Sequence, residues 1–344
     1  MASEIELVAM RRAIDVARER GNCLPNPTVG CVVLDADGRE VGIGATVRKG
    51  AHAEIEALAA AGERAKGGTA VVTLEPCRHI GNTGPCTEAL IAAGVTRVVI
   101  AETDPHSEAG GGAEVLRAAG IEVETGVLAD EAEPHNRAWR FAVVHGRPFV
   151  TWKYAATMDG LSAAPDGSSK WITGPDARRD VQTFRAQCDA IVAGTGAVLA
   201  DDPRLTVRDA EDLPLPYDLQ PLRVVVGETR IPNYYRVFDR VAPTLLIQSR
   251  EPEEVLDKLT ENGIKHAWLE GGPRLAGGFW KAGLIDRVIG YIAPSMLGSG
   301  RAALEGEAAT LADLRPIEIT DLSTVGHDIR IIGTPGAAPR ETYI

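Results

Sequence analysis

The residues best suited to chemistry lie in two short segments of the first half of the chain. His52 stands two residues before Glu54, and Pro76-Cys77 is separated from Cys86 by eight residues. A catalytic zinc ion takes three protein ligands, commonly His and Cys, and leaves its fourth position to water. His52, Cys77 and Cys86 form such a set, and zinc there would lower the pKa of its bound water toward about 7. The spacing therefore predicts a hydrolytic zinc site.

Glu54 is placed to move protons in this site. It lies close to the His52 ligand at the start of the same expected helix, so it reaches the water without binding the metal. Cys86 also begins an expected helix, whose dipole favours a thiolate. His-x-Glu followed by Pro-Cys is the signature of zinc deaminases, although the second cysteine here follows a longer loop.

Other interpretations of these residues stay open. One alternative is that the histidine and the cysteines are core residues that happen to occur in this order. The other is that the zinc is purely structural. A structural zinc needs four protein ligands, and no fourth Cys or His is spaced to complete the set. For Cys23, Cys31 and Cys188 burial is the better interpretation. An odd number of cysteines in a long chain argues against a disulfide framework.

The bulk composition narrows the function classes. A chain of 344 residues with 44% hydrophobic and 24% charged residues has room for two globular domains. Its net charge of −12 argues against a nucleic-acid partner. No apolar run approaches the roughly 20 residues of a membrane span, and the acidic start of the chain does not resemble a secretory leader. We expect a cytoplasmic protein with no membrane partner.

The first half alternates strands and helices. We expect strands over 29–34, 40–44, 69–74, 97–100 and 121–124, and helices over 52–61, 86–93 and 113–119. The first two strands flank a 35–38 turn and predict a hairpin. This alternation predicts an α/β domain with a largely parallel sheet. The punctuation at 145–148 places the domain boundary there, giving domains over 1–147 and 148–344.

The second half is also of the α/β type. We expect strands over 149–155, 190–193, 222–226, 244–247 and 267–269, with a surface loop over 209–222. Thr173 followed three residues later by Asp176 resembles a capping box for a helix that runs to about Cys188.

Two glycine-rich loops follow strands in this half. The 269–278 loop follows an expected strand and opens a helix, and the 194–196 loop follows the expected strand over 190–193. Together the two loops predict one phosphate-binding cleft at the carboxyl edge of the sheet. Simple turns are the alternative, because neither loop has the dinucleotide spacing. Arg185 and Arg208 suit a phosphate ligand. For Arg178 and Arg179 we prefer a solvated helix face.

The first half resembles a known family. Asn26-Pro-x-Val-Gly30, His52-Ala-Glu54, Thr73-Leu-Glu-Pro-Cys77 and the long 78–85 loop are similar to the N-terminal domain of the bifunctional riboflavin biosynthesis family called RibD or RibG. That resemblance implies a cytidine-deaminase-like fold, zinc on His52, Cys77 and Cys86, and Glu54 as proton donor. It also implies that Asn26 and His79 contact a phosphorylated pyrimidine. Departures from the family pattern are Thr46, Asn82 and His106.

The second half resembles the reductase domain of the same family, whose fold is similar to dihydrofolate reductase. The resemblance rests on Lys153-Tyr-Ala-Ala-Thr-Met-Asp-Gly160, Ser168-Ser-Lys-Trp-Ile-Thr173, Asp189-Ala-Ile-Val-Ala-Gly194, Asp201-Asp-Pro and Glu270-Gly-Gly272. It implies an NADPH site formed by Ala155, Trp171, Ala197, Asp201, Gly272, Pro273, Arg274, Leu275, Ala276, Gly277 and Gly278. The implied substrate contacts are Ser169, Arg185, Leu205, Arg208 and Glu270, with Lys153 and Asp201 as the catalytic polar groups.

Two departures concern the cofactor. Ala197 stands where the family usually has Thr, and Glu228 stands near a position that often carries a small hydroxyl. Glu228 would disfavour a cofactor phosphate if its side chain pointed inward. The sequence leaves the choice between NADPH and NADH open.

The resulting hypothesis is a riboflavin-pathway enzyme that deaminates a diaminopyrimidinone ribosylamine phosphate and then reduces its ribosyl group with NADPH. The family likeness also implies a homo-oligomer, a dimer or a tetramer. Three alternatives remain: a deaminase whose second half only binds a ligand or assembles, an RNA-editing deaminase, and a non-catalytic zinc scaffold.

Overall fold

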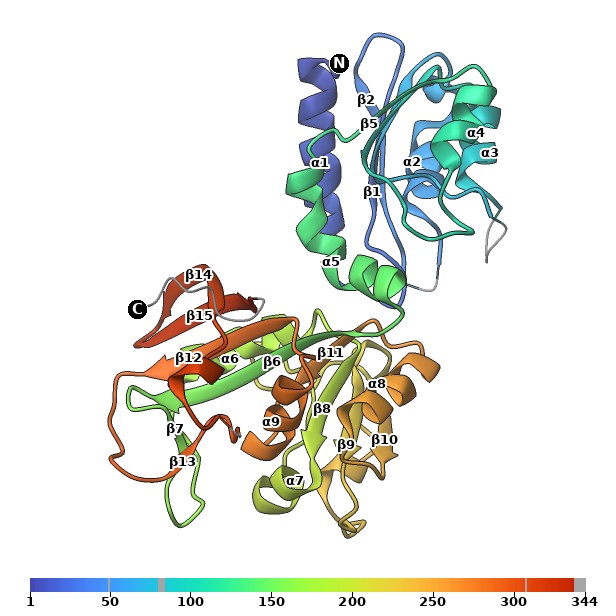
Figure 1. Ribbon diagram of the computed structural model, residues 1–344. Coiled ribbons are helices and arrows are strands. Elements are labelled where there is room, and N and C mark those ends of the chain that lie inside the picture. Colours follow the sequence, from blue (N-terminus) through green and yellow to red (C-terminus); the bar gives the residue numbers. More distant parts are fainter. Residues whose placement is uncertain (49, 80–83, 307, 337–344) are drawn as a thin grey trace. The chain divides into compact units, whose positions relative to one another are not determined.

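The computed structural model describes residues 1–48, 50–79, 84–306 and 308–336. The chain divides into two compact units, Met1–Gly146 and Arg147–Ile344. In Figure 1 the first unit runs from blue to green and the second from green to red. Within the described residues, no helix combines the length and the apolar character that crossing a membrane requires.

The first unit is built on a five-stranded sheet. Its strands, in spatial order, are β2 (Glu40–Ala45), β1 (Gly30–Leu34), β3 (Thr69–Leu74), β4 (Arg97–Glu102) and β5 (Glu122–Thr125). The first three strands pair antiparallel, whereas β3, β4 and β5 run parallel. The helices are α1 (Glu4–Arg20), α2 (Ala53–Ala61), α3 (Cys86–Ala93), α4 (Gly112–Ala118) and α5 (Ala129–His145), with a 3₁₀ turn η1 (Gly62–Ala65). The predicted α/β class is confirmed.

Hydrophobic residues fill both faces of this sheet. One buried cluster joins alternate sheet residues such as Val72 and Val98 to Ala57 of α2 and Leu90 of α3. The other joins Val71 and Val99 to α1 and α5. Because successive strand side chains point to opposite faces, these alternating valines secure both helical layers.

Two glycines set how closely the helices approach the sheet. A Cβ on Gly30 would lie 1.9 Å from the carbonyl oxygen of Ala13, so α1 crosses β1 at a distance that only glycine permits. A Cβ on Gly44 would lie 2.4 Å from the carbonyl oxygen of Ala53, the first residue of α2. This second contact fixes the amino end of α2, where two of the predicted site residues lie.

The second unit is built on an eight-stranded sheet. Its spatial order is β10 (Thr244–Ile247), β9 (Leu222–Val226), β8 (Ala190–Gly194), β11 (His266–Leu269), β6 (Phe149–Thr157), β12 (Arg287–Ala293), β15 (Asp328–Pro335) and β14 (Ile317–Val325). The strands from β10 to β12 are parallel, and β15 and β14 continue the sheet antiparallel. A separate two-stranded ribbon joins β7 (Leu161–Ala163) and β13 (Arg301–Ala302).

Helices cover both faces of the large sheet (Figure 1). They are α6 (Pro175–Arg185), α7 (Thr195–Asp201), α8 (Pro252–Glu261) and α9 (Pro273–Lys281), with 3₁₀ turns η2 (Tyr217–Leu219), η3 (Arg236–Phe238) and η4 (Leu311–Asp313). One buried cluster includes Leu256 of α8 and Phe279 of α9, and the other includes Val181 of α6 and Val198 of α7. Strands at all five positions expected in this half are confirmed.

The start of α6 corrects one prediction. The N-cap residue is Gly174, and Thr173 makes no capping hydrogen bond, so the predicted capping box is wrong. Instead, Asp328 at the start of β15 accepts the Gly174 N–H at 2.7 Å. The helix also ends at Arg185 rather than near Cys188. A carboxylate brought from a distant strand replaces the local cap that the sequence pattern suggested.

Candidate zinc centre and reductase cavity

The three predicted zinc ligands meet at the carboxyl end of β3. His52 is the N-cap residue of α2, Cys77 follows β3, and Cys86 begins α3. Both cysteines are buried. The ring nitrogens of His52 and the two sulfur atoms offer ligand atoms within 4.8 Å of one another. The strand end and the two helix starts therefore gather ligands that are far apart in the sequence.

The donor geometry fits zinc. His52 Nδ1 lies 3.2 Å from Cys86 Sγ and 3.6 Å from Cys77 Sγ. Tetrahedral zinc with ordinary Zn–S and Zn–N bonds separates such atoms by about 3.6 Å. The hydrogen bond to Cys77 and burial raise the pKa of the Cys86 thiol, whereas the same hydrogen bond and contact with His52 hold the pKa of the Cys77 thiol well below its ordinary value. That cysteine is thus readily available as a thiolate, the form that binds metal.

Glu54 lies in the first turn of α2, beside the ligand set, and its side chain is buried. Burial raises the pKa of this carboxyl above its ordinary value, while the charge on His52 acts in the opposite direction. A carboxyl whose pKa moves toward neutrality is better suited to taking up and returning a proton. The arrangement agrees with a proton-transfer role, because Glu54 is adjacent to the ligand set and is not part of it.

His79 is the second notable polar group near this centre. It follows Cys77 by two residues, and its Nδ1 atom is buried without a hydrogen-bond partner among the described residues. Buried polar atoms are nearly always satisfied, so an orphaned one points to a missing ligand or water. Asn26 is half-buried in the segment that leads into β1.

The three departures of this domain lie in different settings. The Thr46 hydroxyl is buried and accepts the Val29 N–H at 3.1 Å, so it supports the backbone before β1. His106 is exposed in a loop, where its Nδ1 accepts the Glu108 N–H at 3.3 Å. Asn82 lies outside the described residues.

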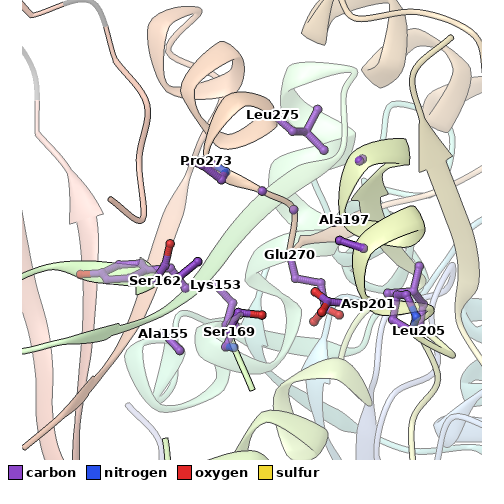
Figure 2. Close-up of a pocket in the computed structure, with 18 of the residues that line it drawn as sticks. Lys153, Ala155, Ser162, Ser169, Ala197, Asp201, Leu205, Glu270, Pro273 and Leu275 are labelled. Atoms are coloured by element: carbon purple, nitrogen blue, oxygen red, sulfur yellow. The ribbon is translucent and has the colours of Figure 1, made fainter. Parts of the chain in front are cut away.

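The second unit contains a large cavity at the carboxyl ends of its parallel strands, with a volume of about 1370 Å³. Ligands of open α/β sheets bind at this edge. Figure 2 shows how residues from several elements gather around it. The predicted residues that line it are Lys153, Ala155, Ser169, Trp171, Arg185, Ala197, Asp201, Leu205, Arg208, Glu270, Gly272, Pro273, Arg274 and Leu275.

Three residues of the predicted glycine loop lie elsewhere. Ala276 is buried in the hydrophobic core, and Gly277 and Gly278 follow it inside α9. None of the three is among the described residues that line the cavity. Because α9 begins at Pro273, the chain turns into the protein after Leu275.

A half-buried charge cluster forms part of the cavity wall, in which the Arg185 and Glu270 side chains are 13% and 14% exposed. Arg185 Nε donates to Glu270 Oε2 at 3.0 Å, and Arg185 Nη2 hydrogen-bonds Glu270 Oε1. Trp268 Nε1 also donates to Glu270 Oε2, at 2.7 Å. Burial lowers the pKa of Lys153, while Glu270 acts to raise it. Glu270 thus supports two cations that face the cavity.

Asp201 lies at the end of α7, opposite the segment that carries Ser169 and Trp171. Lys170 Nζ donates to the Asp201 carbonyl at 2.8 Å and lies 3.5 Å from its carboxylate. The guanidinium of Arg178 lies 4.5 Å from the centre of the Trp171 ring, and both residues line the cavity. Arg178 therefore does not lie on a purely solvated face as expected, whereas Arg179 pairs with Asp176 away from the cavity lining.

The cavity is basic although the chain is acidic. Among the described residues that line it, ten are lysine or arginine and five are aspartate or glutamate. Such a cavity attracts anions. The nine-residue helix α9 points its amino end at the cavity through Gly272 and Pro273, a setting that favours phosphate. A Cβ added to Gly272 would meet no atom within 4 Å, so space is open beside this backbone. These features fit a dinucleotide cofactor.

Sequence reasoning missed several residues that line this cavity. Among them are Ser162, Thr229, Arg236, Arg250 and Arg301. Thr229 and Arg250 follow the strands β9 and β10 within three residues. The rule that ligands bind at carboxyl strand ends would have found these two.

Comparison with known proteins gives the class of both halves. Residues 3–102 match the cytidine and deoxycytidylate deaminase zinc-binding region, and residues 148–329 match the RibD C-terminal domain. The fold and the sites thus define an enzyme that joins a zinc-dependent deaminase to a reductase in one chain. These two domains fit Zn²⁺ and NADPH, the two predicted cofactors.

Relatives extend this match over most of the chain. RibD of Mycobacterium tuberculosis is 49% identical over 300 residues, covering 86% of this chain and 87% of that protein. RibD of Escherichia coli is 42% identical over 356 residues, covering 93% of this chain and 96% of that protein. The chain belongs to the RibD family of bifunctional riboflavin biosynthesis proteins. The predicted family, deaminase and reductase activities are confirmed.

Solved structures show the same architecture. RibD of Acinetobacter baumannii superimposes with a TM-score of 0.90 at 36% identity, covering 97% of this chain and 99% of that chain. A Thermotoga maritima protein described as a diaminohydroxyphosphoribosylaminopyrimidine deaminase/5-amino-6-(5-phosphoribosylamino)uracil reductase gives a TM-score of 0.88 at 32% identity, covering 96% and 99%.

Proposed function

We propose that the chain catalyses two consecutive steps of riboflavin biosynthesis. The first is hydrolytic deamination of 2,5-diamino-6-ribosylamino-4(3H)-pyrimidinone 5′-phosphate. The second is NADPH-dependent reduction of the ribosyl group, which gives 5-amino-6-(5-phosphoribitylamino)uracil. The observation that carries the proposal is the His52, Cys77 and Cys86 ligand set with buried Glu54 beside it, in a chain that also holds a basic cavity for phosphorylated ligands. The name of the Thermotoga maritima relative supports the same pair of reactions.

In the deaminase step the chain's residues hold the pyrimidine and move protons. Zinc bound by His52, Cys77 and Cys86 supplies a Lewis acid that makes water a nucleophile at neutral pH. Glu54 takes the proton released from that water and returns it to the departing amine, so that ammonia leaves. The unpartnered Nδ1 of His79 and the half-buried Asn26 are our proposed contacts for the pyrimidine.

In the reductase step the cavity aligns two phosphorylated ligands. Bound NADPH supplies the hydride that reduces the ribosyl C1 in its open, imine-like form. We place the dinucleotide along Gly272–Leu275, with Ala155, Trp171, Ala197 and Asp201. Ser169, Leu205 and Arg208 hold the ribose phosphate. Lys153 is a cation whose charge Glu270 stabilises. It lies near the hydride acceptor and stabilises the negative charge that develops there as the hydride is transferred.

Three further parts of the proposal concern organisation. We assign the deaminase to residues 1–147 and the reductase to residues 148–344. We also propose a homo-oligomer, dimer or tetramer, and a cytoplasmic location. The likeness to the RibD family supports the oligomer, and the same likeness supports the site residues named above.

Separate readouts test the two activities. Ammonia release from the diaminopyrimidinone substrate without NADPH reports deamination, and NADPH oxidation by the deaminated intermediate reports reduction. NADPH binding with no oxidation would instead favour a second half that only binds a ligand. The many basic residues that line the cavity favour the enzyme, because a substrate and a cofactor that both carry phosphate need such a lining.

A further inference from the structure

A charge pair stands at one end of the reductase cavity, beyond the strands β9 and β10. Arg250 Nη2 lies 3.2 Å from Glu228 Oε2, and both side chains are largely exposed, at 71% and 64%. Arg250 lines the cavity. Gly227 and Thr229 line it on either side of Glu228 along the chain. The carboxylate therefore comes from the cavity rim and is turned toward the arginine.

This end of the cavity is distant from the chemistry. From Lys153 and Ala155 on β6 the cavity follows the spatial order β6, β11, β8, β9 and β10. Four strand spacings of about 4.8 Å separate β6 from β10, so the cavity extends over about 19 Å. The amino end of α9 follows β11, the strand next to β6 on that path. A cofactor whose nicotinamide meets the substrate and whose diphosphate meets α9 must carry its adenosine to β9 and β10.

Two opposite charges at that place have opposite preferences. A guanidinium pairs with the 2′-phosphate that distinguishes NADPH from NADH, because its planar fork matches phosphate oxygens. A carboxylate instead accepts a hydrogen bond from the 2′-hydroxyl of NADH and repels a phosphate. Another arginine on this side, Arg236, is already engaged: its backbone N–H donates to Asp202 Oδ1 at 2.8 Å and its Nε to Oδ2 at 3.0 Å.

We propose that Arg250 and Glu228 together set the cofactor preference of this reductase. Arg250 binds the 2′-phosphate. Glu228 competes with that phosphate for the guanidinium and repels the phosphate. The preference for NADPH over NADH is therefore smaller than Arg250 alone would give. Because exposed ion pairs contribute little net free energy, the phosphate displaces Glu228 at small cost. The inference rests on the proposed reductase function and adds its specificity determinants.

Nucleotide fragments test the proposal without turnover. Isothermal titration of the full-length, zinc-loaded protein with 2′,5′-ADP and with 5′-AMP isolates the contribution of the 2′-phosphate. Arg250→Ala should weaken 2′,5′-ADP about tenfold or more, the value of a lost charge-assisted contact, and change 5′-AMP less than about twofold. Glu228→Gln should strengthen 2′,5′-ADP severalfold, by roughly two- to fivefold. A purely structural role for Glu228 gives the opposite sign.

The matched controls come from a similar pair outside the cavity. Lys258 of α8 forms an exposed ion pair with Glu261, the last residue of that helix, with 2.8 Å between Lys258 Nζ and Glu261 Oε2. Lys258→Ala and Glu261→Gln make the same charge changes in the same unit and should leave both affinities unchanged.

The NADPH-to-NADH ratio of kcat/KM should fall in Arg250→Ala and rise in Glu228→Gln.

Three outcomes overturn the inference. They are an equal loss of both nucleotides in Arg250→Ala, weaker 2′,5′-ADP binding in Glu228→Gln, and no binding of either nucleotide to the parent protein. The proposed function fails in a different way, when the parent protein oxidises neither NADPH nor NADH with the deaminated intermediate. Failure of the fragment test alongside normal oxidation therefore removes only the roles of Arg250 and Glu228.

Discussion

Arg185 and Glu270 lock together at the wall of the reductase cavity through two parallel hydrogen bonds, one of them 3.0 Å long. Arg185 ends helix α6, and Glu270 directly follows β11, so this pair ties a covering helix to the centre of the sheet. Arg185 also donates to the Thr206 carbonyl at 3.0 Å, which fixes the segment that carries Leu205 and Arg208. One bidentate pair thus orients three parts of the proposed substrate site.

Breaking that pair should damage the fold and the reductase together. Glu270→Gln leaves Arg185 and Lys153 in the same half-buried place without their carboxylate. Removing one partner of a fully buried ion pair costs about 3–5 kcal/mol, and the partial exposure of this pair favours the lower end, about 3 kcal/mol. We expect the Tm of the reductase unit to fall by on the order of 10 °C in calorimetry. NADPH oxidation should be lost, whereas ammonia release should persist. Glu253→Gln, on the exposed side of α8, is the control. An unchanged Tm would show that the pair is not structural.

Arg208 should contribute to substrate affinity more than to catalysis. It lines the cavity, and its Nη1 lies 2.7 Å from Asp212, a side chain that is 77% exposed and easily displaced by phosphate. Arg208→Ala should raise the reductase KM for the phosphorylated intermediate about 10- to 100-fold with kcat nearly constant, since a charge-assisted contact contributes about 1.5–3 kcal/mol. Steady-state kinetics beside Arg240→Ala, an exposed arginine, checks this. A KM equal to that of the parent protein would exclude Arg208 from the phosphate site.

Glu54 should be needed for deamination and not for metal binding. Glu54→Gln keeps the shape of the side chain and removes its ability to accept a proton. We expect the zinc content, measured by elemental analysis, to stay at that of the parent protein. Ammonia release should fall about 100-fold or more, and NADPH oxidation should be unchanged. Glu63→Gln in the exposed turn η1 is the matched control. Ammonia release at the parent rate would remove Glu54 from the proton-transfer role.

Glu102 should make the stability of the deaminase unit depend on pH. Burial raises its pKa from the ordinary 4.5 to about 7, although Arg140 lies 3.7 Å away. The folded chain therefore holds this proton more tightly than the unfolded chain. The resulting stabilisation is present below about pH 4.5 and is lost as the pH rises through about 7.

Glu102→Gln should remove this dependence, which is on the order of 3 kcal/mol. Compared with the parent protein, the variant should gain Tm at about pH 8 and show little difference near about pH 5. Calorimetry across that range, with the exposed Glu108→Gln beside it, measures the difference. A difference in Tm that stays constant with pH would contradict the raised pKa of Glu102.

The zinc set was predictable because its signal is local. His52, Cys77 and Cys86 each stand at the start of a helix or just after a strand, so the sequence pattern that predicts those elements also places their side chains at one sheet edge. The same reasoning predicted the parallel strands from β10 to β6 and the cavity at their carboxyl ends, although it missed β12 beside β6.

Features that depend on distant partners were not predictable. Asp328 reaches the start of α6 across 154 residues, and no local pattern encodes such a cap. Arg178 stacks on Trp171, a contact that no local sequence pattern encodes, and we therefore preferred a solvated helix face for it. Strand β14 was missed because a register shift between Ile319 and Asp321 interrupts its alternation of apolar and polar residues. Helix α1 was missed although its capping box, Ser3 and Glu6, is readable in the sequence.

The central claim is that one chain performs both reactions in order. Mass spectrometry of the diaminopyrimidinone substrate, after incubation with the zinc-loaded protein with and without NADPH, tests it most directly. We expect only the deaminated product without NADPH, and the deaminated product with a reduced, ribityl side chain when NADPH is present. Deamination in both cases with no reduced product would contradict the two-step assignment and leave the second unit as a binding module.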